Sequence, residues 1–194
     1  MSFRKCAAHA LCAAAVVACV SQPLLAQDRF GYRILSTSKT STMQKEMQEA
    51  ADSGFRFADV MGGETAIAGS EVLVVMSRQT DPAAWEYRLL ATNKTSTMQK
   101  ELQEAGAAGF DYRGQTQFKS AFGGKEVVVI LERPKDPGAR ISFQYQLLAT
   151  TKTSTMQREL TDAAERGFEF VGLTVGKTAM GGDEVVSVLR RHGR

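Results

Sequence analysis

The sequence predicts an α+β protein of three tandem β-α-β-β repeats, each a three-stranded sheet with one helix on one face. One heptapeptide, Lys-Thr-Ser-Thr-Met-Gln-(Lys/Arg), occurs three times, and the 47 residues around each copy align without a gap. Within each copy, strand periodicity changes to helix periodicity and back. One unit was therefore copied, and positions kept in every copy report what it requires. The repeats are residues 32–78, 87–133 and 145–191.

Each repeat opens with a short strand, such as 32–35, in which aromatic and aliphatic residues alternate. A helix is predicted next, because Ser41 precedes Gln44 by three residues, the spacing of a capping box. Met43 and Met47 then form one apolar helix face. The equivalent capping pairs are Ser96 with Gln99 and Ser154 with Gln157.

A glycine is expected to end each helix, because Gly54 stands where the helical periodicity stops and glycine readily adopts a left-handed conformation. Phe55 and Phe57 then begin a second strand with both rings on one face. The third strand, around 71–76, is apolar on both faces, which is typical of a central strand. We therefore predict the sheet order first, third, second, with the last strand antiparallel to both neighbours. The equivalent glycines are Gly109 and Gly167.

The repeats are expected to share apolar surface, because a 47-residue unit with one short helix buries little on its own. The connections, 79–84 and 134–142, are short and polar, and both contain Asp-Pro. They are compatible with a pseudo-threefold cluster of repeats, or with sheets joined edge to edge.

Residues 1–26 are typical of a signal peptide. Arg4 and Lys5 precede an apolar stretch, 10–20, that is too short to span a bilayer, and a cleavage site ends at Ala26. The alternative is a bacterial lipobox that leaves Cys19 as a lipid-modified terminus. The mature chain is predicted to be periplasmic or secreted, or lipid-anchored outside the cytoplasm through Cys19, without a transmembrane span.

Composition disfavours several classes of function. All three cysteines and one of the two histidines lie in residues 1–26, so we predict no metal, no cofactor and no catalytic activity. Without Arg4 and Lys5, and with no acid in that segment, the formal charge falls from +3 to +1. A near-neutral chain gives little reason to expect nucleic acid as a partner.

The turn before each helix is the main candidate binding site. A helix N-terminus offers free N–H groups and a partial positive charge, so a neighbouring Lys with several hydroxyls could hold a small anion. The alternative is that the hydroxyls cap the helix and the lysines are solvated. The candidate anion-binding residues are Lys39, Thr40, Ser41, Thr42, Lys94, Thr95, Ser96, Thr97, Lys152, Thr153, Ser154 and Thr155.

Two sets of glutamates also recur. We interpret Glu46 and its equivalents as favourable charges near the start of a helix. Glu71 and its equivalents begin the third strand, either as charges that protect sheet edges or as a catalytic pair. Met43 and its equivalents are interpreted as core residues rather than as copper ligands. The equivalents are Glu101 and Glu159, Glu126 and Glu184, and Met98 and Met156.

In the second repeat, Tyr-Arg-Leu-Leu at 87–90, Gly-Phe-Asp-Tyr at 109–112 and Val-Val-Ile-Leu-Glu-Arg-Pro at 128–134 occur in that order. This pattern resembles the small bacterial domain of unknown function 4177, and the resemblance covers each repeat end to end. It implies a β-α-β-β fold and no assigned activity, so no catalytic residue is carried over.

These observations lead to three hypotheses about function. The leading one is an exported, non-catalytic binding or assembly module whose partner is a protein or a small anionic ligand, with oligomers possible. The alternative is a small-anion or anionic-glycan binder that uses Lys39, Lys94 and Lys152. The third is a carboxylate-dependent hydrolase, which requires two recurrent glutamates facing each other across a cleft.

Overall fold

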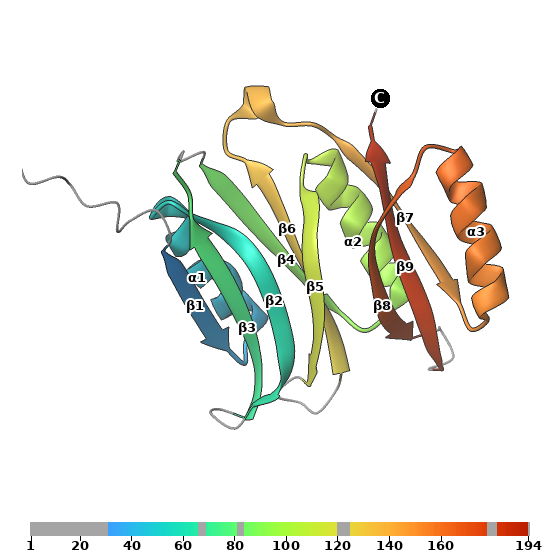
Figure 1. The fold of residues 1–194 in the computed structure, drawn as a ribbon, viewed down its shortest axis with the longest axis horizontal. Coiled ribbons are helices and arrows are strands. Elements are labelled where there is room, and N and C mark those ends of the chain that lie inside the picture. Colours follow the sequence, from blue (N-terminus) through green and yellow to red (C-terminus); the bar gives the residue numbers. More distant parts are fainter. Residues whose placement is uncertain (1–30, 66–68, 81–83, 120–124, 178–181, 194) are drawn as a thin grey trace, which may run out of the picture.

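The computed structural model describes residues 31–65, 69–80, 84–119, 125–177 and 182–193. The predicted signal peptide and Cys19 lie outside this part of the chain. Each repeat has the order β-α-β-β (Figure 1). Repeat 1 contains β1 (Tyr32–Thr37), α1 (Thr40–Asp52), β2 (Phe55–Thr65) and β3 (Gly69–Arg78). Repeat 2 contains β4 (Trp85–Thr92), α2 (Thr95–Ala107), β5 (Asp111–Lys119) and β6 (Lys125–Pro134). Repeat 3 contains β7 (Phe143–Thr150), α3 (Thr153–Glu165), β8 (Glu169–Lys177) and β9 (Asp183–His192).

The strand order in all three sheets confirms the prediction. The sheets are β1-β3-β2, β4-β6-β5 and β7-β9-β8, and every pairing is antiparallel. In each sheet the central strand is the one with apolar residues on both faces, a pattern that suits a strand covered on both sides. In β6, for example, Val128, Val129, Ile130 and Leu131 are all buried.

The glycine at each helix end also behaves as predicted. Gly54, Gly109 and Gly167 have φ angles of +85°, +86° and +79°. Side chains are strained in this left-handed region, so glycine is the residue that lets the chain leave the helix and start the next strand.

The predicted capping box is wrong. Each helix begins one residue before the serine, with Lys39, Lys94 or Lys152 in an extended conformation at the cap, and none of these caps has a side-chain hydrogen bond. A different hydroxyl orders the turn, because the Lys39 N–H donates to Thr37 Oγ1 at 3.2 Å. Lys94 and Lys152 make the same contact with Thr92 and Thr150. The serines lie inside the first helical turn and leave the glutamines available for another role.

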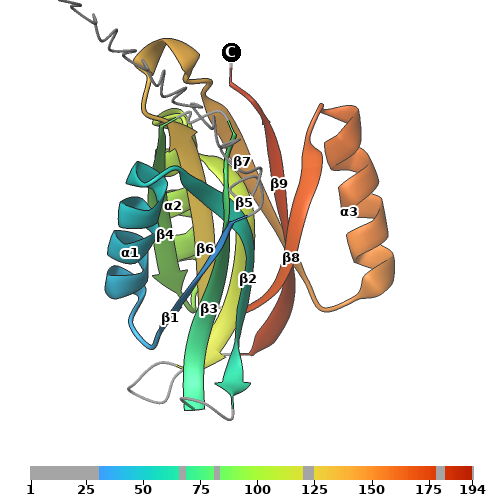
Figure 2. The same ribbon diagram turned by 60° about the vertical axis from the view of Figure 1, so that its left-hand side comes forward.

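The repeats form a row, with β1 at one end in Figure 1 and α3 at the other end in both ribbon views (Figures 1 and 2). Repeat 1 packs on repeat 2, and repeat 2 packs on repeat 3. This arrangement is neither the pseudo-threefold cluster nor the edge-to-edge sheet that the connections allowed. The expected sharing of apolar surface is confirmed, because Tyr87, Val128 and Ile130 of repeat 2 belong to the core of repeat 1. Tyr145 and Val188 of repeat 3 likewise belong to the core of repeat 2. Among the described residues no helix is long and apolar enough to cross a membrane.

Three buried tyrosines are expected to make the fold sensitive to alkali. Burial raises the pKa of Tyr87, Tyr112 and Tyr145 above the ordinary value of 10.0. Above about pH 10 the unfolded chain therefore loses protons that the folded chain keeps, so the stabilisation present below this pH falls as pH rises. The free energy of unfolding should fall by up to about 4 kcal/mol per pH unit if all three titrate only on unfolding. Urea denaturation from pH 8 to pH 11 measures this, and unchanged stability would contradict it.

Candidate functional site: the repeat junctions and the two open ends

The first two helices each pack against the first strand of the following repeat as well as against their own sheet. α1 lies on β4, and α2 lies on β7. We call these contacts the internal junctions. They build one continuous body from units too small to be secure alone.

Glutamines of α1 form hydrogen bonds with the backbone groups at the outer edge of β4. Gln44 Oε1 accepts the N–H of Leu89 at 2.9 Å, and Gln48 Oε1 accepts the N–H of Tyr87 at 3.1 Å. The Gln48 amide also donates to the Trp85 carbonyl at 3.0 Å. An edge strand presents unpaired backbone groups, and here a neighbouring helix supplies their partners.

The second internal junction repeats this pattern. Gln99 Oε1 accepts the N–H of Leu147 at 2.7 Å, and Gln103 Oε1 accepts the N–H of Tyr145 at 3.2 Å. The Gln99 amide donates to the Tyr145 carbonyl at 3.0 Å. The glutamine of the heptapeptide is therefore a contact between repeats, where the sequence had suggested a helix cap.

A tyrosine from each following repeat enters the core of the preceding one. The Tyr87 hydroxyl accepts the N–H of Phe57 at 2.8 Å and donates to Glu132 at 3.0 Å. The Tyr145 hydroxyl donates to the Phe110 carbonyl at 3.0 Å. These bonds satisfy the one polar atom of each buried ring, as buried polar groups require.

Each internal junction contains one ion pair between repeats, but the charges are exchanged. The earlier repeat supplies the arginine at the first junction and the carboxylate at the second. Arg56 of repeat 1 donates to Glu132 of repeat 2, with its Nε 3.0 Å and its Nη2 2.5 Å from Oε1. At the equivalent positions of the second junction, Asp111 of repeat 2 accepts from Arg190 of repeat 3. Each junction is therefore electrostatically distinct, because a wrong pairing of repeats would place like charges together.

Glycines allow aromatic rings to lie directly on the next repeat. A Cβ atom at Gly114 would lie 3.0 Å from Cζ of Phe57, and one at Gly172 would overlap the Tyr112 hydroxyl. Both glycines occupy the same position of the second strand, just after its bulge. A larger residue there would push the neighbouring repeats apart.

The first and last repeats each retain half of such a junction. We call the outer surface of repeat 1 the β1 face, and the outer surface of repeat 3 the α3 face. The β1 face is marked by Tyr32, Ile34 and Met61. The α3 face is marked by Gln157, Phe170, Leu173, Val175 and Val185.

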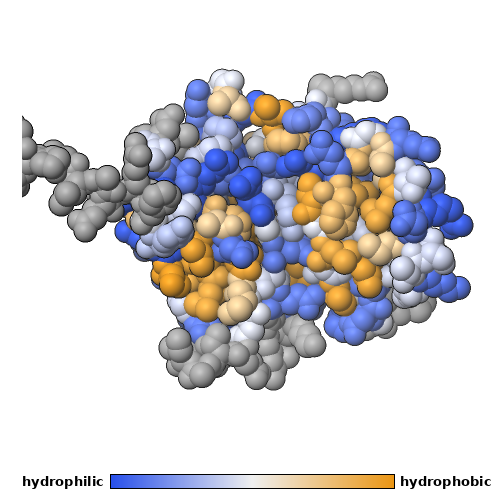
Figure 3. All heavy atoms as spheres, viewed as in Figure 1, coloured by the Kyte–Doolittle hydropathy of each residue, from blue (hydrophilic) through white to orange (hydrophobic). Residues whose placement is uncertain are grey.

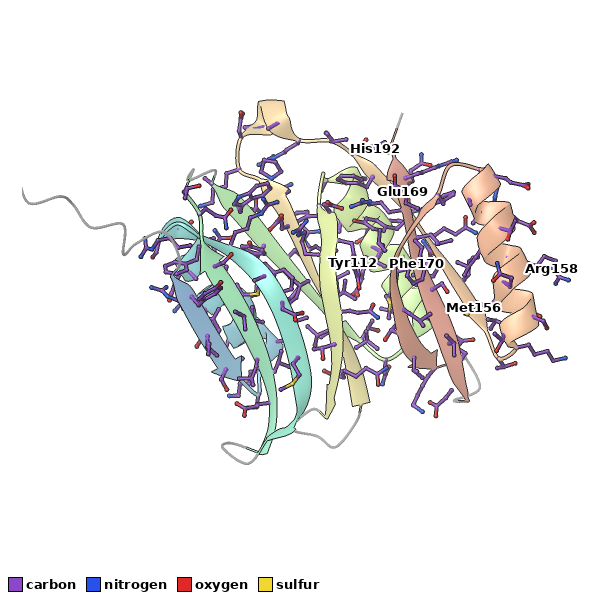
Figure 4. All side chains as sticks on the ribbon, viewed as in Figure 1. Tyr112, Met156, Arg158, Glu169, Phe170 and His192 are labelled. Atoms are coloured by element: carbon purple, nitrogen blue, oxygen red, sulfur yellow. The ribbon has the colours of Figure 1, made fainter. Side chains whose placement is uncertain are left out.

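Exposure at these faces contrasts with burial at the equivalent internal positions. Tyr32 is 68% exposed, whereas Tyr87 is 3% and Tyr145 1% exposed. Phe170 is 54% exposed, whereas its equivalents in β2 and β5 are less than a tenth exposed. Within the described residues, Ile141 is the one exposed large hydrophobic residue outside the two faces. Figure 3 shows apolar surface over repeat 1 and over the strands of repeat 3, and Figure 4 places Phe170 on β8 and Met156 on α3.

The predicted anion-binding turns lie apart, one in each repeat. Lys94, Thr95 and Ser96 line a pocket of about 550 Å³ between repeats 2 and 3, together with Lys177 and Glu184. Glu184 already accepts the Thr95 hydroxyl at 2.6 Å. In repeat 1, Lys39 and Thr40 border a separate small apolar pocket, and in repeat 3, Lys152, Thr153 and Ser154 are exposed at the start of α3. Of the remaining candidates, Ser41 and Thr97 are exposed, and Thr42 and Thr155 are half-buried.

The interpretation of one set of recurrent glutamates as edge-strand charges, and of the other as charges at a helix start, is wrong in both cases. Glu71, Glu126 and Glu184 lie on the central strands β3, β6 and β9, so they do not protect sheet edges. Glu71 is buried and accepts the Ser36 hydroxyl. Glu46 and its equivalents lie in the second helical turn, and the first turns contain no acidic residue. Among the described residues, no group of three or more His, Cys, Asp or Glu could hold a metal.

One sequence pattern does indicate the internal junctions, namely a pair of glutamines on each of the first two helices. Gln44 and Gln48 are four residues apart on one face of a helix, and repeat 2 keeps both. Repeat 3 keeps Gln157 but has Thr161 at the second position. The change falls in repeat 3, whose helix packs against no strand of another repeat among the elements that the structure describes.

Comparison of the chain with known protein families, with curated proteins and with solved structures gave no match.

Proposed function

We propose that this chain is an exported, non-catalytic assembly module that binds partners through the β1 face and the α3 face. One observation carries the proposal, namely that positions buried at both internal junctions are exposed at the two ends. The signal-like residues 1–26 support an exported location.

The terminal repeats of an isolated repeat protein usually have polar outer faces that keep the protein soluble. Here Tyr32 and Ile34 remain at one end, and Phe170 and Val175 remain at the other. A contiguous apolar patch bordered by polar residues is typical of an interaction surface. The ends are therefore better explained as contact surfaces than as caps.

The hydrogen bonds of three glutamates, of which Glu71 and Glu184 are recurrent, support structural roles rather than catalytic ones. Glu132 accepts from Tyr87 and Arg56, Glu184 accepts from Thr95, and Glu71 accepts from Ser36. Anion binding is less well supported than assembly, because the turns do not converge and the Glu184 carboxylate lines the pocket between repeats 2 and 3.

Site-specific photo-crosslinking tests the proposal in cells that express the chain naturally. A photoreactive phenylalanine analogue replaces Tyr32 in one variant and Phe170 in another, and Ile141, exposed on the connection between repeats 2 and 3, serves as the control position. We expect discrete crosslinked products from Tyr32 and Phe170 and none from Ile141. Absence of crosslinks from both faces would refute the proposed function.

A further inference from the structure

We propose that the partner is a second copy of this chain, with the α3 face of one copy bound to the β1 face of the next. This inference rests on the proposed function and adds the identity of the partner. Its basis is that the same two surfaces already meet twice within the chain, at α1 with β4 and at α2 with β7. A third contact of this kind would join two copies.

The α3 face retains the groups that the internal junctions use. Gln157 occupies the position of Gln44 and Gln99, and it is exposed. In α3 its amide donates to the Thr161 hydroxyl at 3.5 Å. In the proposed contact Gln157 Oε1 accepts the backbone N–H of Ile34 in the second copy, as Gln44 accepts the N–H of Leu89.

The β1 face retains the matching groups. Tyr32 and Ile34 occupy the positions of Tyr87 and Leu89, whose backbone N–H groups bind glutamines of α1. In the proposed contact the Tyr32 ring enters the α3 face beside Phe170, as Tyr87 enters the core of repeat 1. Apolar groups that are exposed in the single chain would become buried on both sides.

Three differences make this contact weaker than an internal junction. Asp59 stands where Gly114 and Gly172 admit an aromatic ring, so the Phe170 ring of the first copy must shift. Thr161 is shorter than Gln48 and Gln103. Ser77 replaces the charged residue that pairs across each internal junction, so this contact lacks that ion pair. The association is therefore reversible and depends on protein concentration.

The proposed contact is head-to-tail. Each copy uses two different surfaces, so a dimer still has one free β1 face and one free α3 face. Such contacts generate closed rings or open filaments, depending on the rotation between copies. Association therefore continues beyond the dimer as concentration rises.

Sedimentation velocity of the purified chain lacking residues 1–26, from low micromolar to millimolar concentration, measures the association. We expect the average size to rise with concentration. Asp59→Gly combined with Thr161→Gln restores the internal-junction residues, and it should lower the dissociation constant about tenfold or more. Tyr32→Ala and Gln157→Ala should each raise it by about the same factor, whereas Ile141→Ala should leave it unchanged.

A mixing experiment tests the head-to-tail geometry. Tyr32→Asp blocks the β1 face and Phe170→Asp blocks the α3 face, so each variant alone should remain monomeric. Mixed together they should form a dimer and stop, because one intact face of each kind remains. Circular dichroism confirms that both variants are folded before they are mixed.

A monomeric wild type together with a monomeric Asp59→Gly/Thr161→Gln variant at millimolar concentration would overturn the proposal, and so would a mixture that stays monomeric. If this happened while Tyr32 and Phe170 still crosslinked in cells to a different protein, the second copy would be refuted and the assembly function would stand. If crosslinks were also absent, both proposals would fail.

Discussion

Replacing Tyr87 by alanine is expected to lower the free energy of unfolding by about 3–5 kcal/mol, the range for truncating a large buried aromatic residue. The ring lies in the core of repeat 1, and its hydroxyl links the Phe57 N–H to Glu132. Truncation leaves a cavity between two repeats and removes a hydrogen-bond donor from a buried carboxylate. Urea denaturation followed by the fluorescence of Trp85, the one tryptophan, measures the change.

The chain supplies a matched control for this substitution. Tyr32 occupies the same position in repeat 1 and is largely exposed. At low protein concentration, Tyr32→Ala should change the free energy of unfolding by no more than about 0.5 kcal/mol. Similar losses for the two variants would show that the β1 face is not an open half-junction.

Replacing Leu102 by alanine should cost about 2–5 kcal/mol, the usual range for a fully buried leucine. Leu102 lies on α2 and is fully buried in the core cluster that Tyr145 of the next repeat completes. The matched substitution is Leu160→Ala on α3, where the side chain is half-buried. Its cost should be about 1 kcal/mol or less. Thermal unfolding of both variants compares the losses.

The leucine comparison also depends on protein concentration. If a second copy covers the α3 face, the cost of Leu160→Ala should increase at high concentration, because association stabilises the folded chain. The cost of Leu102→Ala should not change in this way, since α2 is covered within the chain. Equal costs at low concentration would contradict the view that α3 lies at an open end.

The local elements could be predicted because their signals are local. Glycine at the end of each helix, paired aromatic residues in the second strand and a doubly apolar third strand each reflect a constraint within a few residues. Together they gave the correct β-α-β-β order and the correct sheet order. The predicted capping box is wrong, because Ser41 and Gln44 have its spacing but Gln44 binds a strand of another repeat.

The candidate site could not be predicted, because it depends on contacts between distant residues. Gln44 and Leu89 are 45 residues apart, and no periodicity within a repeat indicates which strand a helix will contact. The pairing of Arg56 with Glu132 is equally hidden, since the two residues occupy different positions in different repeats. Once the row of repeats is known, the exposed Tyr32 and Phe170 identify the two ends at once.

The reversed ion pairs have a consequence for how this protein can evolve. If repeat 2 were duplicated in place, Asp111 of the first duplicate would meet the Glu132 position of the second, so two carboxylates would share Arg113, the arginine that pairs with Glu132 within its own repeat. Shuffling or inserting modules would therefore be penalised, although the three modules share one ancestor. Because neighbouring modules have diverged in charge, an added module would need a matching charge at each of its new junctions before it could pack as the present modules do.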